Sequence, residues 1–166
     1  MFRKMRRFRQ QLDREETVAI LERGKTGILG VIGDEGYPYT VPVNYVYRDG
    51  KIYIHGAKAG HKYDAMKAND KVSFCVIDRD DVVAEELTTY FKSAVAFGRV
   101  RILDDENEII EAARILGLKY YNVPEAVDSE IRRELNRLCC YEITIEHLTG
   151  KEAKELMMAR NTEAKQ

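Results

Sequence analysis

The segment from Tyr37 to Tyr47 constrains the fold more than any other part of the chain, because it alternates regularly and contains two prolines. Its odd-numbered positions are all tyrosine or valine, so one face of a β-strand is predicted to join the core. Pro38 and Pro42 remove two backbone N–H groups from the same strand edge and leave Thr40 as the donor between them. We therefore predict a strand at the edge of a sheet.

Such an edge strand allows two interpretations. A flat heterocyclic ligand could bind the main-chain groups that no neighbouring strand uses, and the polar face would lie beside it. Alternatively, the prolines only protect an exposed edge against aggregation. The strand alone does not favour one interpretation over the other.

The residues after this strand are typical of an anion-binding loop. Lys51 to Ala57 is predicted to be a strand reached through a hairpin turn, and Gly60 precedes a short helix. His61 and Lys62 would then lie at the amino end of that helix, where free N–H groups and the helix dipole favour a phosphate group. His55 is predicted either to hydrogen-bond a ligand or to be a partly buried histidine with a protein partner.

Composition and charge exclude several classes of protein. The 166 residues are expected to form one domain, and the net charge of −1 gives no overall attraction to nucleic acid or acidic membranes. Cys75, Cys139 and Cys140 lack the CxxC spacing, so neither a disulfide framework nor a metal site is expected. No apolar run reaches membrane-spanning length and no secretory signal is recognisable, so a cytoplasmic protein is expected.

The two ends of the chain carry most of the remaining charge patterns. Residues 1–12 form a basic arm with Arg3, Lys4, Arg6, Arg7 and Arg9, which could contact an anionic ligand or partner or could simply be solvated or paired with acids. Asp13 with Glu16 resembles a capping box and predicts the start of the first helix. Residues 149–166 are predicted to form a charged helix.

The rest of the chain predicts a mainly β fold. Further strands are expected at 26–33, 71–78, 88–103 and 140–148, and helices at 104–121 and around 127–138. An antiparallel β-barrel with peripheral helices fits this order better than alternating βαβ units.

Three details of these segments are specific enough to test. Gly98 predicts a bulge in its strand. Residues 140–148 are expected to be a half-exposed strand that closes the sheet. Residues 78–86 are expected to be an acidic loop, and a metal site there is not supported because the loop has neither histidine nor cysteine and does not match a calcium loop.

The chain resembles the nitroimidazole-resistance (Nim) proteins, within the pyridoxamine 5′-phosphate oxidase-like flavin-binding split β-barrels. The resemblance is carried, in order, by MFRKMRR, GDEGYPYTVPVNYVY, DGKIYIHGAKAGHK, KVSFCVIDRD, TTYFKSAVAFGRVRIL and EITIEHLTGKEA. It implies a six-stranded antiparallel split β-barrel that forms a homodimer and binds FMN in each of two clefts at the subunit interface.

The resemblance also implies roles for individual residues. The segment expected along the isoalloxazine ring is Thr40, Val41, Pro42, Val43 and Asn44. The residues expected against the ring and the ribityl chain are His55, Gly56 and Ala57. The FMN phosphate would lie beside Gly60, His61 and Lys62, where related oxidases carry an Arg-Lys pair. The residues expected from the second subunit are Tyr90, Lys92 and Ser93.

The implied activity is that of an FMN-dependent oxidoreductase that reduces a nitroaromatic acceptor, with His55 as the candidate proton donor. No GxGxxG sequence is present, so NAD(P)H would dock transiently over the flavin. The alternative from another class is a non-catalytic flavin or haem carrier on the same barrel. Pyridoxamine 5′-phosphate oxidation is a third interpretation, opposed by the lack of an arginine-rich carboxy-terminal signature in EITIEHLTGKEAKEL.

Overall fold

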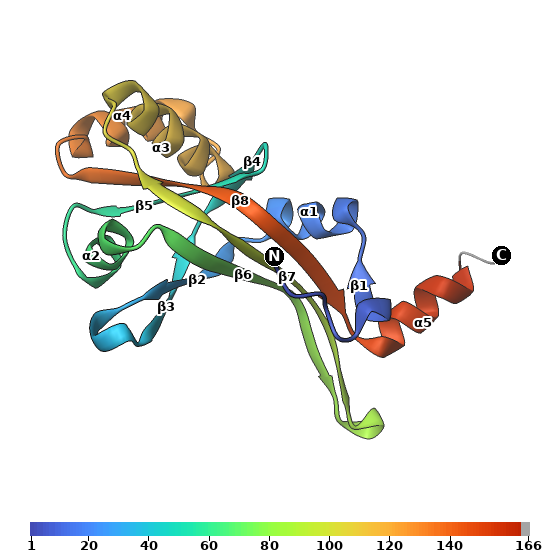
Figure 1. Cartoon of the computed structure of the whole chain (residues 1–166). Coiled ribbons are helices and arrows are strands. Elements are labelled where there is room, and N and C mark those ends of the chain that lie inside the picture. Colours follow the sequence, from blue (N-terminus) through green and yellow to red (C-terminus); the bar gives the residue numbers. More distant parts are fainter. Residues whose placement is uncertain (164–166) are drawn as a thin grey trace.

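A computed structural model describes residues 1–163, which contain one antiparallel sheet of eight strands. The strands are β1 (Gln11–Leu12), β2 (Thr26–Ile32), β3 (Pro38–Asn44), β4 (Val46–Arg48), β5 (Lys51–Ala57), β6 (Lys71–Val83), β7 (Thr88–Ile102) and β8 (Leu138–Glu152). Their order is β3-β2-β6-β7-β8-β5-β4, with β1 paired to β8 (Figure 1). The sheet is strongly curved but not closed. Six of the strands have seven or more residues, which confirms the predicted mainly β split-barrel fold.

The helices lie around this sheet (Figure 1). They are α1 (Arg14–Arg23), α2 (His61–Ala68), α3 (Glu106–Tyr120), α4 (Pro124–Glu134) and α5 (Lys154–Glu163), with short 3₁₀ turns at Phe8–Gln10, Asp34–Gly36 and Ala84–Glu86. None of the helices within residues 1–163 is long and apolar enough to cross a membrane.

Local sequence explains where several of these elements begin and turn. Asp13 caps α1, because its side chain accepts a hydrogen bond from the N–H of Glu16 at 2.8 Å. Asp49 and Gly50 both have positive φ angles, of 50° and 80°, as a tight hairpin turn between β4 and β5 requires. The predicted irregularity at Gly98 is confirmed, since the pairing of β7 with β8 shifts register there.

The core has two parts. The larger cluster lies inside the curved sheet, where Ile20 and Leu21 of α1 belong to one buried cluster with strand residues such as Leu29, Phe74 and Ile54. The smaller cluster lies beneath α3 and α4 and includes, from both helices and the adjoining strands, Leu103, Ile109, Val127, Ile131 and Cys140. Both clusters contact β8, which therefore holds the two halves of the molecule together.

Four predictions were wrong in whole or in part. Residues 78–83 are not a loop but continue β6, which forms with β7 a long hairpin that projects from the body of the molecule (Figure 1). β8 lies inside the sheet, between β7 and β5, and its residues 139–143 are buried, whereas residues 144–148 are exposed or half-buried as predicted. Residues 149–152 belong to β8, so the carboxy-terminal helix α5 begins only at Lys154. Leu138, expected in a helix, opens β8.

Candidate functional site

The free edge of β3 carries the arrangement that its two prolines predict. Tyr39, Val41 and Val43 turn half-buried side chains to the core, whereas the alternate residues are exposed. The N–H of Gly33 bonds the carbonyl of Tyr37, so the alternation of an antiparallel ladder directs the main-chain groups of residues 38, 40 and 42 away from β2. Because β3 ends the sheet, no described strand pairs with that edge.

Lys62 is the most unusual charged residue of α2, the helix whose His61 stacks on Tyr39 of β3. It lies in the first turn of α2 and is half-buried, and within residues 1–163 its ammonium forms no ion pair with a carboxylate. Burial lowers the pKa of Lys62 below its ordinary value, because a desolvated cation loses hydration. A cation held in this way is available to an anion that is not part of the described chain.

The glycine at position 56 makes room for this lysine. A Cβ atom placed on Gly56 would lie 3.2 Å from Lys62 Nζ and 3.5 Å from Tyr141 Cε2. Tyr141 donates a hydrogen bond from its hydroxyl to the carbonyl of Ala57 at 3.2 Å, and Cys139 pairs with Gly56 in the sheet. Tyr141 and Cys139 therefore line the Lys62 slot. Sequence reasoning missed them because only the pairing of β5 with β8 brings them there.

His61 takes a different direction from Lys62. Its ring stacks on that of Tyr39 with centroids 4.1 Å apart, and its Nε2 accepts the N–H of Asp34 at 3.3 Å. The imidazole is thus held against the β2–β3 turn. Gly60 precedes it with a φ angle of 103°, which favours glycine, and no atom would meet a side chain there within 4 Å. The backbone at the amino end of α2 is therefore open.

His55 lies one residue before Gly56 and pairs with Cys140, so strand alternation directs its side chain to the face opposite Lys62. Desolvation, and then the charge of Lys62, lower the pKa of His55, which favours a neutral imidazole at pH 7. The structure therefore brings the backbone of residues 55–57 close to Lys62, but not the imidazole itself. Its role as a proton donor stays a prediction.

The remaining predicted residues divide between two places. Asn44, at the end of β3, donates from its side chain to the carbonyl of Lys25 at 3.1 Å. Tyr90, Lys92 and Ser93 lie on the projecting hairpin, with Tyr90 bonded to Glu86 and Lys92 paired with Glu16. The side-chain contacts described for Tyr90 and Lys92 are with Glu86 and Glu16, and none of the contacts described for residues 1–163 joins these residues to Lys62 of their own chain.

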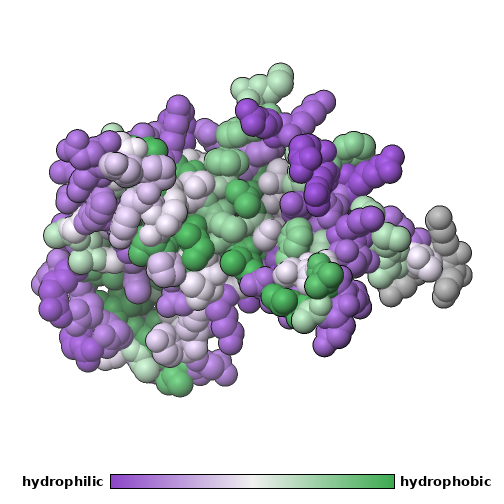
Figure 2. Space-filling view, turned by 90° about the horizontal axis from the view of Figure 1, so that it is seen from below, coloured by the Kyte–Doolittle hydropathy of each residue, from purple (hydrophilic) through white to green (hydrophobic). Residues whose placement is uncertain are grey.

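The outer face of the sheet carries a groove of about 550 Å³ next to the β3 edge. Thr40, Ser73, Ile32 and Phe97 line parts of it, and the last two are large apolar residues that are exposed. Figure 2 shows hydrophobic surface gathered in the middle of the face seen from below, with hydrophilic residues around it. An apolar face of this kind commonly marks an interaction surface.

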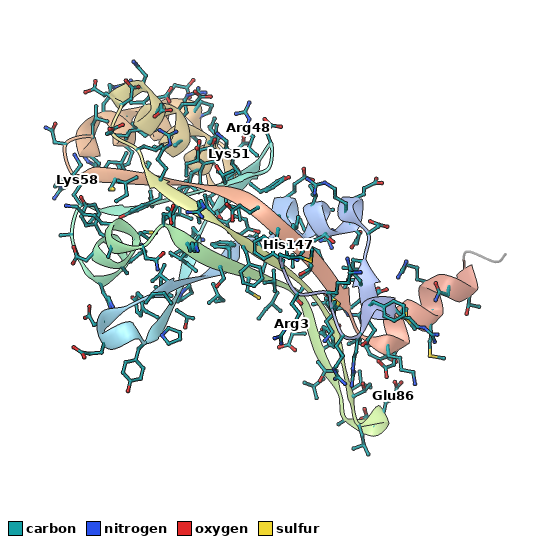
Figure 3. The ribbon with its side chains drawn as sticks, viewed as in Figure 1. Arg3, Arg48, Lys51, Lys58, Glu86 and His147 are labelled. Carbon is teal, nitrogen blue, oxygen red and sulfur yellow. The ribbon has the colours of Figure 1, made fainter. Side chains whose placement is uncertain are left out.

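A second polar cluster lies at the opposite end of β5, and the carboxylate at its centre is paired with cations. Glu142 is buried and accepts hydrogen bonds from Lys51 at 3.0 Å and Tyr53 at 3.1 Å, and Arg101 pairs with it at 3.3 Å. Figure 3 shows Lys51 and Arg48 at this end, far along β5 from Lys58. Burial, with Glu142 next, raises the pKa of Tyr53 to about 12. The mutual pairing indicates a structural role.

A family model described as pyridoxamine 5′-phosphate oxidase matches residues 13–152, which include seven of the eight strands, all except β1. The chain belongs to this family. The resemblance stated from the sequence is therefore confirmed at the level of the family. A comparison with curated protein sequences gave no significant match.

Solved structures of low sequence identity share the fold. A candidate 5-nitroimidazole antibiotic resistance protein from Bacteroides thetaiotaomicron aligns with a TM-score of 0.71 and 21% identity, over 86% of each chain. The flavocytochrome Anf3 from Azotobacter vinelandii aligns with a TM-score of 0.74 and 20% identity, over 91% of this chain and 72% of that one. An FAD-binding protein from Mesorhizobium loti aligns with a TM-score of 0.62 and 24% identity, over 87% of this chain and 97% of that one.

Proposed function

We propose that the protein is an FMN-binding oxidoreductase, active in the cytoplasm as a homodimer, that reduces nitroaromatic acceptors. The observation that carries this proposal is Lys62, a half-buried ammonium without a described anionic partner at the open start of α2, a helix that also contacts the unpaired strand β3 through the stacking of His61 on Tyr39. A phosphate and a flat ring on one ligand would use both features. The names of the flavin-binding relatives support a flavin as that ligand.

The residues present fit FMN. Lys62 and the N–H groups at the start of α2 would hold the phosphate, and Gly60 leaves space for it. Thr40 offers an N–H between the carbonyls of Pro38 and Pro42, which suits the alternating acceptors and donors at the pyrimidine end of isoalloxazine. FMN supplies hydride or electron transfer when it is bound.

The residues of the chain itself would bind FMN and orient its ring. Half-buried Tyr39 and Val41 fix the β3 backbone by packing on the core, so Thr40 presents its N–H from a rigid strand. Tyr141, bonded to Ala57, fixes the backbone on the opposite side of the Lys62 slot. The hairpin of a second subunit would add Tyr90, Lys92 and Ser93 and would exclude water from the ring.

A nitroaromatic acceptor is proposed because the relative from B. thetaiotaomicron is described as a 5-nitroimidazole resistance protein. NADH or NADPH would act as reductant. The second candidate is a flavin or haem carrier, favoured by the relative described as a flavocytochrome. Of the three histidines, His61 stacks on Tyr39 and His147 stacks on Phe2, which leaves the exposed His55 as the candidate axial ligand for haem. Pyridoxamine 5′-phosphate oxidation, the activity for which the family model is named, is the third candidate.

The test begins with the purified protein loaded with FMN. The proposal expects a flavin absorption spectrum, anaerobic bleaching by NADH or NADPH, and reoxidation by a 5-nitroimidazole. A Soret band in place of the flavin spectrum would support the haem carrier. Reduced protein that no nitroaromatic, quinone or ferric acceptor reoxidises would support a flavin carrier, and turnover of pyridoxamine 5′-phosphate would support the third candidate.

A further inference from the structure

The basic arm at the amino terminus is the largest concentration of charge that the proposed FMN site leaves unused. Of the 27 lysines and arginines in the chain, five lie within residues 3–9, and the first acidic residue is Asp13. Their side chains are exposed, and within residues 1–163 none of them takes part in an ion pair. Elsewhere many arginines do pair, as Arg23 does with Asp78 and Arg114 with Asp128. The cations of the arm are therefore available to an anionic ligand or partner that is not part of the described chain.

The arm is held at both of its ends. Phe2 stacks on His147, with centroids 4.6 Å apart and planes within 5°, and on Phe97 at 5.6 Å. At the other end Gln10 is buried and donates to the carbonyl of Glu152 at 3.2 Å, just before β1 pairs with β8. Figure 3 shows Arg3 and His147 near the base of the hairpin that ends at Glu86. A tethered arm loses less entropy when its arginines bind a ligand.

Strand register places the arm beside the part of the hairpin expected at a second subunit's flavin. Gln11 pairs with Lys151, and Lys151 pairs with Ser93, so Gln11 and Ser93 are two strand spacings apart, about 10 Å. Lys151 adds a further cation to this surface, since its ammonium lies 5.1 Å from the centre of the Phe91 ring. The surface formed by residues 3–9 and Lys151 is named the arm surface below.

We propose that the arm surface binds the phosphate groups of a dinucleotide whose ring end reaches the flavin site of the second subunit. This inference rests on the proposed function. Four of the five arm cations are arginines, whose planar forks bind phosphate oxygens in pairs. The single phosphate of FMN is already provided for at Lys62, so the arm surface serves phosphates beyond it. Those belong either to NADPH or NADH as reductant, or to the adenylate half of FAD in place of FMN.

A nucleic acid is the less suitable polyanion. Duplex binding depends on an extended cationic face, whereas this chain carries a net charge of −1 and the arm spans only residues 3–9. A dinucleotide requires only a few contacts, which the arm can supply at one place.

The experiment compares two variants that each remove three positive charges. The first, R6Q/R7Q/R9Q, removes three of the five cations of the arm and keeps the anchors Phe2 and Gln10 intact. The second, K25Q/R48Q/R132Q, neutralises three exposed cations that are not part of the arm surface. Dissociation constants are measured for FMN and FAD on the apoprotein, and for NADP⁺ and NAD⁺ on the FMN-loaded protein, by calorimetry without turnover.

The proposal expects R6Q/R7Q/R9Q to weaken at least one dinucleotide by about tenfold or more, because each lost charge-assisted contact to phosphate has roughly that effect. FMN affinity should change by less than about twofold. A loss for NADP⁺ or NAD⁺ identifies the reductant, and a loss for FAD alone identifies the flavin tail.

Unchanged affinity for all dinucleotides would overturn the proposal, and so would an equal loss in K25Q/R48Q/R132Q or an equal loss for FMN. Binding of a short DNA duplex as tight as that of the best dinucleotide would also overturn it. If wild-type protein bound no FMN at all, the proposed function would fail first, and the two failures are thereby distinguished.

Discussion

Replacing Lys62 by methionine should weaken FMN binding and leave the folded protein as stable as before or more stable. The ammonium lies in a half-buried slot beside Gly56 and Tyr141 without a described carboxylate partner, and its pKa is lowered by burial. A charge-assisted hydrogen bond to a phosphate contributes about 1.5–3 kcal/mol. Its loss should therefore raise the dissociation constant of FMN roughly tenfold to a hundredfold.

The effect on stability has the opposite sign because the apoprotein holds this charge at a cost. Methionine fills a similar length of slot with an apolar chain and removes the desolvation of a cation. The linkage agrees with this. A lysine whose pKa is lower in the folded than in the unfolded state makes the free energy of unfolding increase as pH rises through the window between the two pKa values. Lys62→Met should remove that increase.

The assay is a fluorescence titration of apoprotein with FMN at pH 7, together with urea unfolding of the apoprotein. Lys67→Met is the matched control, since Lys67 lies on the same helix and is exposed, with its ammonium 5.9 Å from the Tyr63 ring. The control should keep FMN affinity within about threefold. If Lys62→Met binds FMN as tightly as wild type, the phosphate assignment and the proposal built on it are refuted.

Three further predictions concern single side chains. NMR titration should show the pKa of His55 below its ordinary value, and Lys62→Met should raise that pKa. Because the pKa is lower in the folded than in the unfolded state, the free energy of unfolding should fall as pH drops below about 6.5, and His55→Gln should remove that loss. Arg160→Ala should lower the free energy of unfolding, measured in urea, by about 3 kcal/mol, because Glu152 is 1% exposed and accepts hydrogen bonds from Arg160 at 2.6 and 3.0 Å. If the unpaired carboxylate of Glu152 is the cause, the double variant Arg160→Ala/Glu152→Gln should recover stability, and no recovery would contradict this explanation. Asp13→Ala should cost about 1 kcal/mol by loss of the α1 cap, and Asp13→Asn distinctly less.

The sequence predicted the parts of the fold that local chemistry controls. Pro38 and Pro42 required an edge strand, and β3 is one. The glycine before His61 predicted the start of a helix, which begins there. Asp13 predicted the cap of α1. Each of these features depends on backbone donors or φ angles within a few residues, so no knowledge of distant contacts was needed.

The wrong predictions concern segments whose structure depends on contacts with residues far away in the sequence. Residues 78–83 have charged side chains and no apolar alternation because both faces of the projecting hairpin are largely exposed, so they looked like a loop. β8 alternates from Tyr141 to His147, but α3 and α4 cover one face and the curved sheet encloses the other, so its first half is buried on both sides. The direction of His61 towards Tyr39 depends on how α2 sits on the β2–β3 turn. Periodicity cannot report any of these.

The pairing of β5 with β8 joins segments from opposite halves of the chain, as the partners Ile54 and Tyr141 show. Folding must therefore close a long loop before this pairing stabilises anything, which places the chain among slow folders with times of about milliseconds to seconds. During synthesis, the edges of β5 and β7 that pair with β8 stay unpaired until β8 has left the ribosome. Replacements in β8 should consequently reduce the yield of correctly folded protein more than equal losses of stability near α1.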